Sequence, residues 1–132
     1  MIPEPKWIDK RALLLLHEES LALFGGARGL RDEGLLDSAL ARPLNQFLYD
    51  TSSDLAALAA TYGHGIAKNH AFIDGNKRAA FLSVGLFLLI NGSRLRAEQV
   101  DAIRTMLAVA DGTLDEKDFA VGIRDHSRSE LK

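Results

Sequence analysis

Apolar residues recur at helical spacing along most of the chain, and short polar segments with glycine, proline or aspartate separate the apolar runs. This pattern predicts a first helix over residues 9–24, with an aspartate cap at its start and Gly25-Gly26 at its end. Asp32 is expected to cap a second helix that stops before Pro43, because a proline disfavours helical dihedrals in the residue ahead of it. A short, irregular helical turn is predicted over residues 44–48.

The middle of the chain predicts two helices separated by a short break at residues 70–75. The first covers residues 54–69, and its apolar face is formed by Leu55, Leu58, Ala59, Tyr62 and Ile66. The second covers residues 76–90 and ends at Asn91-Gly92. It contains the longest apolar run, residues 79–90, which is too short for a bilayer crossing of roughly 20 residues. We therefore expect this helix to be buried at the centre of the domain.

Two further amphipathic helices are predicted toward the C-terminus. The inner face of the first is expected to consist of Val100, Ile103, Leu107 and Ala110. Asp111-Gly112 closes this helix, since glycine is a common helix C-cap. The second begins at about Asp115 and is expected to direct Phe119 and Ile123 toward the core.

The remaining segments carry little regular structure. Residues 25–32 contain three glycines and two arginines, which predicts a mobile loop or a small hairpin. The polar tail after His126 is expected to fray. Strand signals are weak, and Tyr49-Asp50 with Arg94-Leu95-Arg96 would form one short pairing at most. The predicted fold class is all-α: one domain over residues 1–132, a single compact helical bundle around the central hydrophobic helix.

The composition is that of an ordinary globular protein, with 47% hydrophobic residues and a formal net charge of -2. The basic residues are scattered and outnumbered by acidic ones, which argues against direct binding of nucleic acid. The absence of cysteine excludes disulfides, thiolate metal sites and cysteine nucleophiles. No signal peptide is visible at the start of the sequence, so we expect a cytoplasmic protein that is not membrane-bound.

The candidate chemistry is concentrated in residues 70–78, which read His-Ala-Phe-Ile-Asp-Gly-Asn-Lys-Arg. Gly75 permits a tight turn, and the first backbone amides of the following helix lack intrahelical acceptors. The helix dipole adds positive potential there, so a phosphate would be held well. Lys77 and Arg78 lie in the first turn, where cations oppose the dipole. This conflict suggests a nearby anion, with two solvated surface residues as the alternative.

Several side chains of this segment have two interpretations each. Asp74 could cap the following helix or hold a magnesium ion that bridges nucleotide oxygens. Asn76 could bond phosphate oxygens or brace the loop. A lone histidine is more often structural, but His70 lies beside the phosphate site and an imidazole can accept a proton near neutral pH. A hydrolytic metal site with His64 as a third ligand is disfavoured, because the spacing does not place three ligands on one helical face.

The pattern His-x-Phe-x-Asp-Gly-Asn-Lys-Arg resembles the signature of the Fic/Doc family, specifically its Doc (death-on-curing) branch. Residues 25–32, 40–43 and 87–92 also resemble Doc proteins, so the similarity extends from about residue 8 to residue 125. The motif fixes many residue types within a helix–loop–helix context, which makes it far more specific than a glycine-rich loop alone.

The resemblance implies a toxin of a toxin–antitoxin pair. Such a protein would transfer the γ-phosphoryl group of ATP to a threonine or serine of elongation factor Tu and stop translation. In this comparison His70 is the general base and Asp74 the Mg²⁺ ligand, and the ATP phosphates are bound by Gly75, Asn76, Lys77 and Arg78. Arg28 and Arg31 lie on a loop that resembles the family's target-docking flap, although solvated loop arginines are the alternative.

Two positions depart from the pattern Gly-Asn-Gly-Arg-x-x-Arg of family members that transfer AMP. Lys77 replaces a glycine that permits close approach of the phosphates, and Phe81 replaces an arginine that clamps them. Both changes disfavour the usual ATP pose and agree with the Doc-like one. AMP transfer to a protein hydroxyl is the alternative activity, and a catalytically inactive Fic-fold binding module is the alternative without catalysis.

The sequence shows no inhibitory helix of the kind that many Fic proteins carry. That motif places serine or threonine four residues before a glutamate followed by glycine or asparagine. Glu33 is the only such glutamate, and Gly29 stands four residues before it. The resemblance therefore implies inhibition in trans by an antitoxin, a small DNA-binding protein whose disordered C-terminal segment folds onto the toxin.

Overall fold

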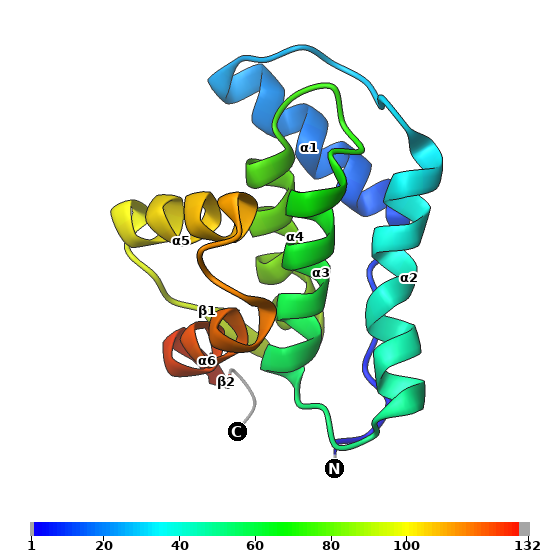
Figure 1. Cartoon of the computed structure of the whole chain (residues 1–132), viewed down its shortest axis with the longest axis vertical. Coiled ribbons are helices and arrows are strands. Elements are labelled where there is room, and N and C mark those ends of the chain that lie inside the picture. The colour runs from blue at the N-terminus through cyan, green and yellow to red at the C-terminus, as the bar shows by residue number, and fades with distance from the viewer. Residues whose placement is uncertain (1, 130–132) are drawn as a thin grey trace.

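The computed structural model describes residues 2–129 as a bundle of helices with one short two-stranded sheet (Figure 1). The elements are α1 (Lys10–Phe24), α2 (Glu33–Tyr49), α3 (Leu55–Asn69), α4 (Asn76–Ile90), β1 (Ser93–Leu95), α5 (Gln99–Asp111), α6 (Glu116–His126) and β2 (Ser127–Ser129). Helices α3 and α4 pack against each other at the centre, α2 and α6 flank α3, and α1 and α5 lie against α4. The predicted all-α bundle around the hydrophobic helix is therefore confirmed.

Aspartate side chains define where four of the described helices begin. Asp9, Asp32, Asp54 and Asp115 each accept a hydrogen bond from a backbone N–H two or three residues further on. Each bond satisfies one of the amides that a helix start leaves without a partner. The predicted starts of these helices are confirmed. Helix α4 differs, because its N-cap is Gly75 and no side chain caps it.

The core forms where α4 meets α3. Its side chains on α4 include Val84, Phe87 and Leu88, all buried. A Cβ atom at Gly63 of α3 would lie 2.8 Å from Val84 Cγ2 and 2.9 Å from Phe119 Cε2, so this glycine permits α3 to approach both α4 and α6 closely. Within residues 2–129, no helix combines the length and the hydropathy that a bilayer crossing requires.

The expected end of the second helix before Pro43 is wrong, because α2 continues through this residue to Tyr49. A proline inside a helix removes one backbone hydrogen bond, but here its ring is buried. The turn after it buries Phe47, whose ring lies 5.9 Å from that of Trp7. Tertiary packing thus outweighs the local preference, and Tyr49 belongs to a helix rather than to a strand.

Residues 127–129 of the tail do not fray as expected but form β2, and residues 130–132 lie outside the described residues. Strand β2 pairs antiparallel with β1, with Ser93 opposite Ser129 and Leu95 opposite Ser127. The strand predicted at residues 94–96 is therefore present as β1, with a different partner from the one expected. The sequence Ser-Arg-Ser does not alternate apolar and polar residues, so it gives no strand signal of its own. The pairing arises from the backbone groups that β1 would otherwise leave unpaired.

Helix α5 is present, but the face that it buries differs from the prediction. Met106 and Val109 are buried, whereas Ile103 and Leu107 are 53% and 49% exposed. Apolar residues occupy two adjacent stripes of this helix, and packing against α3 and α4 selects one of them. Periodicity alone could not choose between the two. The side chain of Val100 lies outside the described residues.

Candidate active site

The loop of residues 70–75 joins α3 to α4 at the end of the molecule where α1 also ends (Figure 1). His70 caps α3 in the left-handed conformation, with φ 52° and ψ 44°, and is the one non-glycine residue with positive φ among residues 2–129. Such a conformation costs roughly 1–3 kcal/mol and persists only where the surroundings enforce it. The residue is exposed, so its imidazole is accessible to a substrate.

The carboxylate of Asp74 is exposed and held by backbone groups. Gly75 N donates to Oδ1 at 2.8 Å, and Ala27 N donates to Oδ2 at 3.3 Å. The bond from Gly75, followed by that from Ala27, lowers the pKa of Asp74, so this carboxylate is ionised at neutral pH. An exposed, ionised oxygen ligand suits Mg²⁺, which commonly takes one or two carboxylates and completes its shell with phosphates and water.

The first turn of α4 is open to an anion. The earliest intrahelical bond to its N-cap runs from Ala79 N to Gly75 O at 2.8 Å, so the amides of residues 76–78 precede the hydrogen-bond ladder. Gly75 has φ 75°, and a Cβ atom there would lie 3.2 Å from His17 Nε2. Both the conformation and the space at this turn therefore favour glycine.

Asn76 braces the loop, which is one of its two predicted roles. Its Oδ1 accepts from Phe72 N and its Nδ2 donates to Phe72 O, each at 3.0 Å. Phe72 itself is buried and holds the loop to the core. The backbone amide of Asn76, rather than its side chain, is the group available to a phosphate. Lys77 is exposed and forms no ion pair with another described residue.

Arg78 extends from the first turn of α4 to the end of α1. Its Nη1 donates to Ser20 O at 3.2 Å and its Nη2 to Gly25 O at 2.9 Å. The guanidinium carbon also lies 5.8 Å from the centre of the Phe24 ring. Arg78 thus caps α1 while standing beside the predicted phosphate site. Binding of phosphate by Arg78 remains a prediction, as do the roles of the other residues of the motif.

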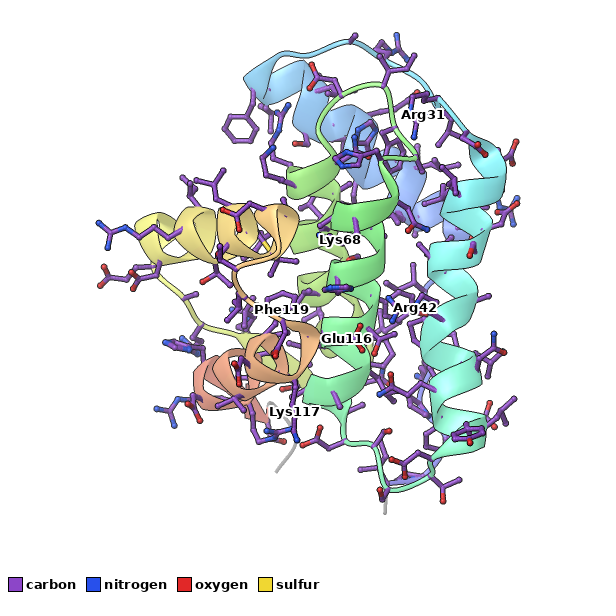
Figure 2. All side chains as sticks on the ribbon, viewed as in Figure 1. Arg31, Arg42, Lys68, Glu116, Lys117 and Phe119 are labelled. Atoms are coloured by element: carbon purple, nitrogen blue, oxygen red, sulfur yellow. The ribbon has the colours of Figure 1, made fainter. Side chains whose placement is uncertain are left out.

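The segment of residues 25–32 lies alongside the motif loop and does not form a hairpin of its own. Ile73 N donates to Gly29 O at 3.1 Å, and Arg31 N donates to Ala71 O at 2.7 Å. The Arg31 side chain, labelled in Figure 2, donates from Nε to His70 O at 2.8 Å. Arg31 is therefore part of the loop's support, whereas Arg28 pairs with Glu18 of α1 at 3.2 Å.

The three side chains of the disfavoured hydrolytic metal site do not form a cluster. Residues 2–129 contain no group of three histidine, cysteine or acidic side chains placed to hold a metal ion. His64 lies in mid-α3, with Nδ1 3.4 Å from an oxygen of Glu116, which Figure 2 labels between α3 and α6. Burial lowers the pKa of His64. Its neighbour Glu116 also accepts from Arg42 at 2.8 Å, which indicates a structural polar cluster.

His17 lies outside the motif, and no pattern in the sequence connects it with the motif loop. Its buried ring stacks on Phe72, with 3.8 Å between the ring centres, and its Nε2 lies 2.8 Å from Asp74 O. The available signal was position: His17 lies four residues after Leu13 and four before Leu21, on the buried stripe of α1. The 57 residues between His17 and Asp74 hide the contact from any local pattern.

The Fic/DOC family matches residues 7–88, a span that includes α1 to α3, the motif loop and α4 up to residue 88. The chain belongs to the Fic/DOC family. Two curated relatives place it in the Doc branch of that family.

The first relative is named Toxin Doc and comes from Mycolicibacterium smegmatis. It is 39% identical over 97 residues, which cover 70% of this chain and 75% of the relative. The second is named Protein kinase doc and comes from Escherichia phage P1. It is 35% identical over 85 residues, which cover 64% of this chain and 68% of the relative.

Proposed function

We propose that this protein is a Doc-type toxin that transfers the γ-phosphoryl group of ATP to a serine or threonine hydroxyl of a translation factor similar to elongation factor Tu. The observation that carries the proposal is one short loop that holds an accessible imidazole, His70, an ionised carboxylate, Asp74, and the uncapped amides of α4. The names of the two relatives, a toxin and a protein kinase, support it.

In this reaction each functional group of the loop has a separate role. His70 accepts the proton of the target hydroxyl while the hydroxyl oxygen forms a bond to the γ-phosphorus. The bond between the γ-phosphorus and the bridging oxygen of the β-phosphate breaks, and ADP leaves. The α4 amides and Lys77 stabilise negative charge on the phosphates. Mg²⁺ held by Asp74 would neutralise phosphate charge when bound. Catalysis rests mainly on positioning and charge stabilisation, as in phosphoryl transfer generally.

The first two turns of α4 favour γ-phosphoryl transfer over AMP transfer. Lys77 adds a side chain where AMP-transferring relatives have glycine, and it restricts how closely phosphates approach the helix. Phe81, one turn later, is partly buried against the core and offers no charge to a phosphate. AMP transfer, which would attach the α-phosphorus to the target, is the outcome that the labelling experiment below distinguishes.

A protein antitoxin is the partner that the proposal requires, bound through a disordered C-terminal segment. Large apolar side chains remain exposed on three helices: Leu15, Leu23 and Phe24 on α1, Leu89 on α4, and Ile103 and Leu107 on α5. Exposed apolar side chains suit an amphipathic segment that folds as it binds. Because the proposed target is a translation factor, the proposed place of action is the cytoplasm, without direct contact with nucleic acid or membrane.

The test uses ATP labelled separately at the α and γ positions. The purified protein is incubated with MgATP and purified elongation factor Tu, and then with a translation extract. Label entering protein from the γ position, and its loss with His70→Ala, supports the proposal. Label from the α position supports AMP transfer instead. In cells that express the protein, growth arrest that persists with His70→Ala would indicate a binding module without catalytic activity. His126→Ala, an exposed histidine at the end of α6, is the matched control.

A further inference from the structure

His17 is a buried imidazole to which the proposed chemistry gives no step. Its side chain extends from the middle of α1 and is 2% exposed. Leu13 and Leu21, one turn before and one turn after it, are buried as well. A regular helix therefore fixes the position of this ring, and a ring fixed in this way can orient a neighbouring loop.

The ring contacts the motif loop at two points. Its plane stacks on Phe72, with 3.8 Å between ring centres and 24° between planes. Its Nε2 lies 2.8 Å from Asp74 O. A carbonyl oxygen only accepts hydrogen bonds, so Nε2 carries the hydrogen and donates it. One side chain of α1 thus holds both the buried anchor of the loop and the peptide just before α4.

The bond to Asp74 O determines how the next peptide group faces. In a trans peptide the carbonyl and the N–H point in opposite directions, and residues 2–129 contain no cis peptide. With the Asp74 carbonyl directed at His17, the N–H of Gly75 points away from it and donates to Asp74 Oδ1 at 2.8 Å. The orientation of the exposed carboxylate therefore depends on a peptide that His17 holds.

The same contact brings side chains of α1 close to the turn. A Cβ atom on Gly75 would lie 3.2 Å from Nε2 and 3.4 Å from Leu21 Cδ2. On its other side the carboxylate is held by Ala27 N, from the segment that follows α1. Side chains of α1 and the backbone of the segment after it thus contact the Asp74–Gly75 turn on two sides.

We infer that His17 is a positioning residue: its Nε2–H fixes the Asp74–Gly75 peptide, so that the Asp74 carboxylate and the α4 amides are in place before MgATP binds. The benefit for nucleotide binding rests on the proposed function, whereas the effect on the loop does not. Preorganisation of this kind raises affinity because the loop does not have to be ordered during binding. The inference requires a donor at position 17, and an aromatic ring alone is insufficient.

The test compares three variants of the full chain. His17→Gln keeps an N–H donor, His17→Phe keeps a ring that can stack on Phe72, and His17→Leu is the second donor-free variant in case the phenylalanine is not accommodated. Far-UV circular dichroism and thermal melting establish which variants fold. The first readout is the NMR titration of the Asp74 carboxyl in the free protein, and the second is the dissociation constant of MgATP by calorimetry.

The expected result separates the donor from the ring. In the donor-free variants the pKa of Asp74 should move up toward its ordinary value, because the Gly75 N–H is no longer held against the carboxylate. MgATP binding should weaken about tenfold, as expected for loss of a buried hydrogen bond. His17→Gln should restore the dissociation constant of MgATP to within about threefold of that of the unaltered chain, and should raise the pKa of Asp74 less than the donor-free variants do.

Two results would overturn the inference: an Asp74 titration that is unchanged in the donor-free variants, or one that is changed equally in His17→Gln. Any charge of His17 is absent from all three variants, so it cannot account for a difference among them. A failed proposed function gives a different result. In that case the unaltered chain binds no MgATP and transfers no label, while the Asp74 titration still reports on His17.

Discussion

The starts of α3 and α4 use the same residue type in opposite ways. Asp54 is the N-cap of α3, and its carboxylate turns onto that helix to accept from Ala57 N. Asp74 stands one position further from its helix, because Gly75 is the N-cap of α4. Its carboxylate binds the amides of Gly75 and Ala27 instead. A shift of one residue therefore closes one helix start and leaves the other open to a ligand.

The electrostatics of the two aspartates differ accordingly. The pKa of Asp54 is lowered first by the Arg124 guanidinium, whose Nε and Nη2 lie 2.7 and 3.0 Å from its two oxygens. The pKa of Asp74 is lowered first by the backbone amide of Gly75. Both are ionised at neutral pH, but the charge of Asp54 is paired by a side chain, whereas Asp74 forms no ion pair with another residue that the structure describes. Only the second remains available to a metal ion.

The largest expected effect falls on the chemistry at the open start. His70→Ala should lower phosphoryl transfer by about 10²- to 10⁴-fold, the usual contribution of a general base. The thermal midpoint should remain near that of the unaltered chain, because the side chain is exposed and alanine keeps a Cβ atom at this left-handed position. Transfer kinetics with labelled ATP and a melting curve check both statements. Full activity in the variant would remove His70 from the mechanism.

A smaller effect is expected when the turn at the start of α4 is altered. Gly75→Ala places a Cβ atom at positive φ and 3.2 Å from His17 Nε2. We expect a loss of about 1–2 kcal/mol in the free energy of unfolding and weaker MgATP binding. Gly85→Ala in the same helix is the control, since its Cβ would meet nothing within 4 Å and alanine favours a helix by about 0.5–1 kcal/mol. Equal behaviour of the two variants in urea unfolding would contradict this account.

At the closed start the expected effect is on stability alone. Asp54→Ala removes the cap of α3 and the partner of Arg124, and should cost about 1–2 kcal/mol with MgATP affinity unchanged. A folded-state pKa that is lowered adds stability above the unfolded value, near 3.9, and this stability is lost as pH falls through the folded value. The stability difference between the unaltered chain and the variant should therefore shrink below about pH 4. Urea unfolding from pH 7 to pH 3 measures it, and a constant difference would argue against the ion pair.

The smallest expected effect is that of salt on the pKa values of Asp54 and Asp74, whose carboxylates are held by different partners. Raising the salt concentration to about 1 M shortens the Debye length to about 3 Å and screens the ion pair of Asp54. The pKa of Asp54 should therefore move toward its ordinary value, while that of Asp74, which depends first on a backbone hydrogen bond, should move less. Carboxyl NMR titrations at low and high salt give both values in one experiment. Equal shifts would show that the two sites differ less than their contacts suggest.

Local signals predict most of the helix boundaries, because their causes are local. Aspartate caps mark four of the starts, and Gly75 and Gly112 mark turns that need positive φ. The continuation of α2 through Pro43 and the orientation of α5 depend on packing partners far away in the sequence. Neither can be obtained from periodicity, which reports how a helix is patterned but not which neighbour it meets.

The candidate site, like the fold, could be predicted from the sequence only in part. The motif shows which residues gather in one loop, so His70, Asp74 and Gly75 could be predicted from it. It does not show what each side chain touches. The side-chain amide of Asn76 binds the backbone of Phe72, and the guanidinium of Arg78 binds carbonyls at the end of α1. A residue pattern encodes neither contact.

Arg78 has a practical consequence for mutagenesis. Its guanidinium holds the carbonyls of Ser20 and Gly25, so its removal would uncap the end of α1 as well as take a cation from the first turn of α4. An inactive Arg78→Ala enzyme would therefore report two losses together. Arg78→Lys keeps the charge but cannot span both carbonyls as a planar fork does. A comparison of the two substitutions separates the electrostatic contribution of this arginine from its architectural one.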